Sequence, residues 1–192
     1  MSNPIFDKFA PKFTLQDLKE LEVIDQAFIF EHFTSLDAYR LGQIIIDLSL
    51  RYTDQISLTI IRESDELPIF QFVNDKKAMR NIDFAMKKRN TVLKTNHNSL
   101  WAMAKASQDP SFTLDESCLP VGGSFPVIVN GELVATVSVS GLHDGKDFDL
   151  LFNAFKEIQG SGYKYRALGI FRNNPLLRRS YSMEYKAFVR RA

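Results

Sequence analysis

Three consecutive basic residues, Lys87, Lys88 and Arg89, could attract a carboxylate or a phosphate group. They lie in a segment from about 81 to 96 whose apolar residues recur at helical spacing, so we expect a helix with a very basic exposed side. A basic run of this kind is also typical of a solvated helix face that binds nothing. An anion site at this helix therefore needs further groups from elsewhere in the chain.

Two other motifs could supply those groups. Gly122-Gly123 would let backbone amides approach an anion closely, but the pair precedes a predicted strand and no phosphate-loop pattern surrounds it, which favours a strained turn. Thr136, Ser138 and Ser140 alternate with valines, which places three hydroxyls on one face of a strand. Such a row either forms a solvated sheet face or lines a ligand cleft.

Catalytic and metal chemistry have little support. His32, His97 and His143 have no spacing that would place two of them on one helix face as metal ligands. His32 falls in a predicted strand, where a partly buried, hydrogen-bonded side chain is expected. Cys118 and His143 could form a nucleophile and base, but no motif places either beside an oxyanion hole. We therefore expect a structural thiol, no metal site, and a binding protein in preference to an enzyme.

Capping residues and periodicity indicate the helices that must position these groups. Thr14 can cap a helix while Asp17 reciprocates at the third position. Thr34 or Ser35 can cap the next helix, with Asp37 in its first turn. Two further helices are expected, one opening at Asn98 or Ser99 and one spanning 147–159.

Strands are predicted where β-branched and aromatic residues form short runs. The runs 56–62 and 68–73 suggest an antiparallel pair, and 27–33 has the length of another strand. The clearest signal is FPVIVNGELVATVSVSG, in which two such runs flank Asn130-Gly131, the dipeptide preferred by a type I′ hairpin turn. These elements together indicate a mixed domain of helices and antiparallel strands.

Composition limits the class of protein. The chain has 192 residues, of which 45% are hydrophobic and 24% charged, close to the averages of a single globular domain. No apolar run is long enough to span a bilayer, and the N-terminus has charges and prolines where a secretory signal would be continuously apolar. A single cysteine excludes an internal disulfide. We therefore expect a soluble protein in the cytoplasm, without a membrane span.

The two ends of the chain differ from its body. We expect an N-terminal arm over 1–13, a domain over 14–160 and a basic, aromatic extension over 161–192. Residues 160–192 hold eight basic residues and one acidic residue, whereas the remainder of the chain is acidic overall. The extension could bind nucleic acid. Over nucleic-acid binding we favour three other interpretations taken together. The extension could be a mobile tail, a helix folded onto the acidic body, or a segment unrelated to the domain's activity.

Several strings resemble one known family. TSLDAYRLGQIII, NIDFAMKKRNTVLKTNHNSLWAM and VGGSFPVIVNGELVATVSVSGL, followed by a closing helix, are similar to the haem-degrading-domain or HbpS/GlcG-like proteins over roughly 15–159. The resemblance implies an α/β (α+β) fold in which helices pack on a five-stranded antiparallel sheet, as in profilin. It also implies a homo-oligomer and, in some relatives, haem binding.

The resemblance also points to particular positions. The family's basic helix maps onto 85–91, which singles out Lys87 with Arg89 close by. The chain departs from the family at Val121, where a histidine is usual before the glycine pair, and at 146–148, where a run of two acids and a histidine is usual. Imidazole is a common haem-iron ligand, so we expect a changed or lost ligand.

The sequence therefore predicts a domain whose hairpin, glycine turn and basic helix border a pocket for a small anionic ligand, either haem or another carboxylate-bearing molecule. A protein-interaction scaffold with a basic C-terminal arm is the alternative, and an enzyme that uses a bound cofactor is a third. The predicted ligand-binding residues are Lys87, Arg89, Gly122, Gly123, Thr136, Ser138 and Ser140.

Overall fold

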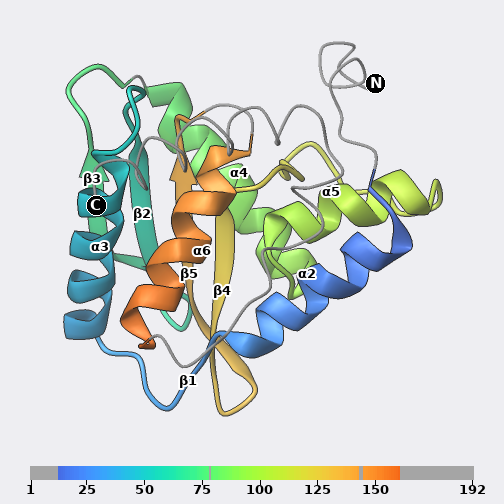
Figure 1. Cartoon of the computed structure of the whole chain (residues 1–192), viewed down its shortest axis with the longest axis horizontal. Helices are drawn as coiled ribbons and strands as arrows, with labels where there is room; N and C mark the ends of the chain where they lie inside the picture. Colours follow the sequence, from blue (N-terminus) through green and yellow to red (C-terminus); the bar gives the residue numbers. More distant parts are fainter. Residues whose placement is uncertain (1–12, 78, 143–144, 161–192) are drawn as a thin grey trace, which may run out of the picture.

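A computed structural model describes residues 13–77, 79–142 and 145–160. Helices and strands mix along this part of the chain, and the strands form one five-stranded sheet in the order β1-β4-β5-β2-β3 (Figure 1). The elements are α2 (Leu15–Ala27), β1 (Ile29–Phe30), α3 (Ser35–Ser49), β2 (Ser57–Arg62), β3 (Leu67–Val73), α4 (Met79–Thr95), α5 (Ser99–Gln108), β4 (Ser124–Val129), β5 (Glu132–Ser140) and α6 (Lys146–Ile158).

The predicted five-stranded sheet with packed helices is confirmed, with one difference in strand direction. β2 with β3, β2 with β5, and β4 with β5 are antiparallel, whereas β1 pairs with β4 in parallel. The strand predicted over 27–33 has only two residues, Ile29 and Phe30, opposite Ile128 and Val129. It ends there because β4 itself ends at Val129 and turns into the hairpin.

Local signals correctly located the starts of two helices and the turn of one hairpin. Thr14 with Asp17 and Thr34 with Asp37 form complete capping boxes at the starts of α2 and α3. The β4–β5 hairpin turns at Asn130-Gly131, whose φ angles of 51° and 82° suit a type I′ turn. These predictions are confirmed because each depends on contacts within a few residues.

The two faces of the sheet differ in chemistry. One face is apolar and is covered by α3 and α6, which lie side by side in front of the sheet in Figure 1. Phe125, Phe148 and Phe155 are buried there, with ring centroids of Phe125 lying 5.1 and 5.3 Å from the other two. The opposite face carries the hydroxyl side chains, and α4 covers it.

The ends of the chain lie mostly beyond the described part. Residues 1–12 of the expected arm and 161–192, the expected extension, lie outside the described residues, while Phe13 is buried in the core. None of the helices in the described part is long and apolar enough to cross a lipid bilayer.

Candidate functional site

The basic run on α4 does not form an exposed face, which corrects the prediction for that helix. Only Lys87 is exposed, whereas the side chains of Lys88 and Arg89 are 4% and 8% exposed. Each residue turns a helix by about 100°, so Lys88 and Arg89 share the buried side of α4 with Ala85 and Val92. That side packs on the polar face of the sheet, where acidic partners neutralise both cations.

Lys88 is the centre of a buried polar cluster that joins three elements. Its Nζ donates to Asp147 Oδ2 at 2.6 Å and to the backbone oxygen of Val139 at 3.0 Å. The other carboxylate oxygen, Asp147 Oδ1, accepts the backbone N–H of Leu142 at 2.9 Å. These bonds tie α4 to the end of β5 and to the start of α6.

The glycine pair leaves room for that cluster. Gly123 has a φ of +125°, and a Cβ placed on it would lie 2.6 Å from Lys88 Nζ and 2.6 Å from the Val139 oxygen. A Cβ on Gly122 would lie 2.8 Å from the Cβ of Phe148. The structure thus brings the glycine turn, the basic helix and the β5 segment together at Lys88. The predicted ligand contacts of both glycines stay a prediction.

Arg89 and Thr136 share one acidic partner. Arg89 Nε donates to Glu63 Oε1 at 3.0 Å, a second nitrogen of its guanidinium donates to the other carboxylate oxygen, and Thr136 Oγ1 donates to Oε1 at 2.6 Å. Hydrogen bonding to Glu63 raises the pKa of Arg89 above its ordinary value. The ion pair of Arg89 with Glu63 thus joins α4 to the residue that directly follows β2.

The hydroxyl row of β5 is buried beneath α4, so its interpretation as a solvated sheet face is wrong. Thr136, Ser138 and Ser140 are all buried. Ser138 Oγ lies 2.8 Å from Ser124 Oγ on the neighbouring strand. The buried hydroxyls of two β2 residues, Ser57 and Thr59, have no hydrogen-bond partner among the residues that the structure describes.

Lys87 lies on the other side of α4 and fixes the loop that leads to the glycine pair. Its Nζ donates to the backbone oxygen of Glu116 at 2.8 Å, and its own backbone oxygen accepts the N–H of Leu119 at 3.0 Å. Asn90 holds the same loop through the backbone oxygen of Ser117 at 2.9 Å. Lys87 is thus separated from the buried groups with which the sequence grouped it.

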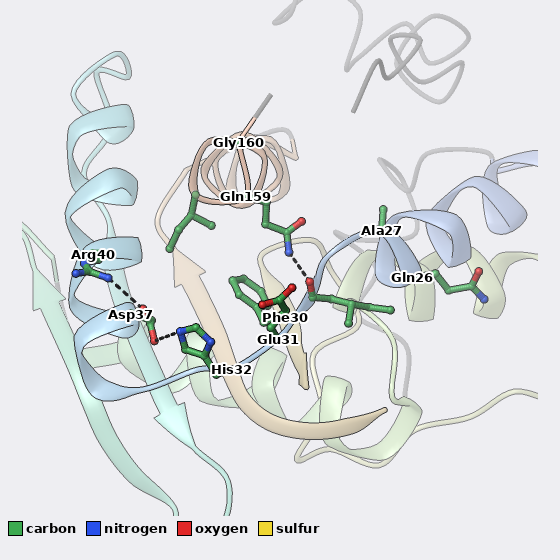
Figure 2. A pocket seen from close by; sticks show the side chains of 11 residues that line it. Gln26, Ala27, Phe30, Glu31, His32, Asp37, Arg40, Gln159 and Gly160 are labelled. Carbon is green, nitrogen blue, oxygen red and sulfur yellow. Dashed lines mark hydrogen bonds and ion pairs between the residues drawn. The ribbon is translucent and has the colours of Figure 1, made fainter. Parts of the chain in front are cut away.

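A pocket of about 1030 Å³ lies at the β1 edge of the sheet, between the start of α3 and the end of α6 (Figure 2). Figure 2 shows His32 and Arg40 on either side of Asp37, and Phe30 beneath the end of α6. Its apolar wall includes Phe30 and Ile158. Its volume lies at the upper limit of the range of small-molecule sites, about 300–1,000 Å³.

The charged groups of this pocket are held by the cap of α3. Asp37 accepts the backbone N–H and the hydroxyl of Thr34 at 2.8 and 2.7 Å, and these bonds lower the pKa of Asp37. Its side chain is only 16% exposed, whereas those of Arg40 and His32 are 61% and 74% exposed. A ligand would therefore meet the guanidinium, the imidazole and the exposed carboxylate of Glu31 more than Asp37.

Sequence reasoning missed this pocket because its residues come from separate segments that meet only in the fold. His32 was expected to be partly buried in a strand, but β1 ends at Phe30 and leaves the imidazole exposed. The available signal was the Thr34–Asp37 capping box, which predicts that His32 and Arg40 flank the same helix start.

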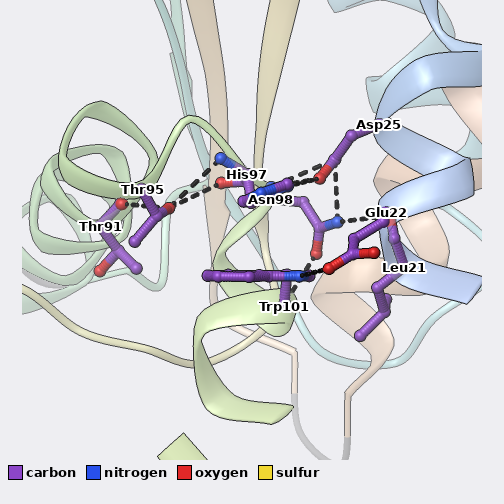
Figure 3. Close-up of polar contacts among 8 residues, drawn as sticks. All are labelled: Leu21, Glu22, Asp25, Thr91, Thr95, His97, Asn98 and Trp101. Atoms are coloured by element: carbon purple, nitrogen blue, oxygen red, sulfur yellow. Dashed lines mark hydrogen bonds and ion pairs between the residues drawn. The ribbon is translucent and has the colours of Figure 1, made fainter. Parts of the chain in front are cut away.

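A third polar group joins α2 to the start of α5 (Figure 3). Asp25 accepts the backbone and side-chain N–H groups of Asn98 and lies 2.9 Å from Nδ1 of His97. The His97 ring stacks on Trp101 at 4.0 Å between centroids, and Trp101 Nε1 donates to Glu22. The bonds of Asp25 and Glu22 link α2 to the start of α5, so this group holds α2 in place.

Asp25 and Asp115 are expected to give stability opposite dependences on pH. Burial raises the pKa of Asp25 above its ordinary value of 3.8, so the folded state holds this proton more tightly than the unfolded state does. The free energy of unfolding therefore falls as pH rises above 3.8. Bonding to Lys94 and Ser117 lowers the pKa of Asp115 to about 2, so its contribution is present above 3.8 and is lost toward pH 2.

The measurement is urea denaturation at several pH values. The free energy of unfolding of wild type minus that of Asp25→Asn should fall as pH rises above 3.8. The free energy of unfolding of wild type minus that of Asp115→Asn should rise as pH increases from about 2 to 3.8. Two differences with the same slope would contradict the assignment of Asp25 as a carboxyl penalised by burial.

The described residues include no group of three or more His, Cys, Asp or Glu side chains that could hold a metal ion. Cys118 is a buried free thiol, in agreement with the prediction. His143, its suggested partner, lies outside the described residues.

The chain matches the family model described as haem degrading protein HbpS-like over residues 33–155. A UPF0303 protein of Paraburkholderia phymatum is 29% identical over 159 residues, which cover 79% of this chain and 95% of the relative. A UPF0303 protein of Rhizobium leguminosarum bv. trifolii is 29% identical over 146 residues, covering 72% and 87%.

Solved structures share the fold at low identity. The Ybr137w protein superposes with a TM-score of 0.64 at 20% identity, covering 72% of this chain and 84% of its own. HbpS gives a TM-score of 0.56 at 18% identity over 67% and 91% of the two chains. The PduOC:Heme complex gives 0.55 at 14% identity over 64% and 92%.

Proposed function

We propose that this chain, which belongs to the HbpS-like family, is a cytoplasmic small-ligand-binding protein whose pocket at the β1 edge takes a carboxylate-bearing molecule such as haem. The observation that carries the proposal is the pocket itself, where exposed Arg40 and His32 stand beside an apolar wall. The family match supports a ligand of this class, and one similar structure is a haem complex.

The lining groups fit the parts of such a ligand. A guanidinium pairs with a carboxylate through two parallel hydrogen bonds, which assigns the acidic side of the ligand to Arg40. Phe30 and Ile158 offer apolar surface to a flat ring, and the imidazole of His32 is a suitable iron ligand. Bound haem would supply a redox-active iron, while these residues would bind and orient it.

The glycine turn does not offer the same fit for iron. Where relatives are expected to carry histidines, this chain has Val121 and Phe148, and Phe148 is fully buried against Phe125. Lys87 is an exposed basic residue of α4, and its Nζ bonds to the loop that leads to the glycine pair. It is our second location for an anionic ligand, because the sequence-based residues have not been tested.

A haemin titration followed by the Soret band separates the two locations. We expect a saturable shift in wild type. For His32→Ala we expect a changed spectrum and a dissociation constant at least tenfold higher, a loss of about 1.4 kcal/mol. For Arg40→Ala we expect weaker binding with an unchanged spectrum. Lys87→Ala is the matched control at the second location and should bind as wild type does.

Each other outcome has a definite meaning. Weaker binding by Lys87→Ala alone would move the ligand to the basic helix. A titration without saturation would exclude haem. An iron-free porphyrin and simple dicarboxylates, tested by thermal stabilisation, would then decide whether the pocket binds any ligand of this class, since a ligand of the folded state raises its stability.

A further inference from the structure

We propose that the open edge of β3 and the adjoining outer side of α3 form the surface through which two copies of this chain associate. β3 is the last strand of the sheet, and within the described residues it pairs only with β2. Its sequence, LPIFQFV, has no charged side chain. Open edge strands are normally protected from pairing with another chain by charges, bulges or proline. In β3 the proline, Pro68, and the register irregularity lie in its first half, which leaves 69–73 without such protection.

The backbone of β3 is suited to pairing with itself. Directly after the strand, the N–H of Asn74 donates to the oxygen of Ile56 at 3.0 Å. In an antiparallel pair, the backbone N–H and C=O groups of successive residues point alternately toward the partner strand and away from it. Because those of Asn74 point toward β2, those of Gln71 and Val73 point away from it. Pro68, which has no N–H, lies earlier in the strand. A second β3 running antiparallel, centred on Gln71, would satisfy these groups with identical ones.

Charges at the two ends of β3 favour a second copy as the partner. Asp65 and Glu66 precede the strand and form ion pairs with Arg62 and Arg89. Asp75, Lys76 and Lys77 follow it, and Lys77 Nζ donates to the backbone oxygen of Gly141. A two-fold axis at Gln71 would place Glu66 of one copy opposite Lys76 of the other, twice in each dimer. Both residues are exposed. Such rim pairs set the orientation of an interface more than its strength.

The outer side of α3 extends this surface with apolar residues. The helix approaches β3 closely, with the Tyr39 ring edge-on to Phe70 at 6.3 Å between centroids. Residues spaced by three and four positions lie on one stripe of a helix, as at the seam of a coiled coil. The stripe that contains Tyr39 runs along this side of α3 and ends at the residue that follows the helix. It consists of Leu36, Tyr39, Gln43, Ile46 and Leu50, all exposed or half-buried.

Disulfide cross-linking tests the strand pairing in the full chain. Across the two-fold axis the Cα atoms of Gln71 and its counterpart would lie about 5.5 Å apart, within disulfide reach. We therefore expect oxidised Gln71→Cys to migrate as a covalent dimer. Leu67→Cys is the control, because its counterpart would lie about 26 Å away along the strands. Native Cys118 is buried, which limits its contribution. Equal cross-linking of both variants would overturn the proposal.

Sedimentation over a range of concentrations tests the helix and the charges. We expect wild type to associate and Tyr39→Glu to raise the dissociation constant at least about tenfold. Val23→Glu, at an equally exposed position on α2 (53% for both residues), should behave as wild type. Lys76→Glu should weaken association, and adding Glu66→Lys should restore it.

Two results would overturn the interface. One is a monomeric wild type at every concentration, and the other is an equal effect of Tyr39→Glu and Val23→Glu. Circular dichroism reports whether each variant is folded. If Tyr39→Glu does not fold, the charge exchange between positions 66 and 76 decides the question, because both side chains are on the surface.

Discussion

Lys88→Met is expected to lower the free energy of unfolding by about 3–5 kcal/mol, because it leaves the carboxylate of Asp147 buried without its cation. The same change removes the donor of the bond to the Val139 oxygen. Urea denaturation with linear extrapolation measures the loss. A loss of this size is a large part of the stability of an ordinary domain.

Two variants make the result specific. Lys87→Met removes the neighbouring charge but only an exposed hydrogen bond, and should cost less than about 1 kcal/mol. Lys88→Met with Asp147→Asn removes both charges and keeps an acceptor for the Leu142 N–H, so it should recover most of the loss. If Lys88→Met were as mild as Lys87→Met, the ion pair would not be shielded from water as the structure requires.

Gly123→Ala is the second change with a large expected effect, at least about 3 kcal/mol of lost stability. A residue with a side chain is strained at a φ of +125°, and the new Cβ would lie 2.6 Å from the backbone oxygen of Val139. The backbone cannot easily move away, because the oxygen of Gly123 accepts the Val139 N–H at 2.7 Å. Thermal or urea unfolding measures the change.

Gly131→Ala is the matched control for this substitution. Gly131 also has a positive φ, +82°, but nothing lies within 4 Å of a Cβ placed there. Only the backbone strain remains, which costs about 1–2 kcal/mol. Equal losses at the two glycines would mean that the close approach of Lys88 and Val139 to Gly123 contributes nothing.

These two predictions concern the strings that carry the family resemblance. The glycine turn and the basic helix meet at a buried ion pair, so Lys88 and Gly123 have a structural role in this fold. A ligand-binding role for the neighbouring Lys87 stays a separate question. Testing stability and ligand binding on the same variants distinguishes the two roles.

The sequence by itself determined the features that depend on near neighbours. Thr14 with the reciprocating Asp17 predicted where α2 begins, Thr34 or Ser35 with Asp37 predicted the start of α3, and Asn130-Gly131 predicted the β4–β5 turn. Caps and turns are formed by residues within about four positions of one another, so their partners are visible in the sequence. The family resemblance added the five-stranded sheet.

Only the tertiary structure decided what the charged and polar residues do. Lys88 appeared exposed because its partners, Val139 and Asp147, are 51 and 59 residues away in the chain. Helical periodicity shows which side chains of a helix share a side. It does not show whether another element places an opposite charge against one of those side chains. The pocket beside His32 was missed for the same reason, since α6 reaches it only in the folded chain. Burial of a charge depends on long-range partners, and these exist only once the elements have packed.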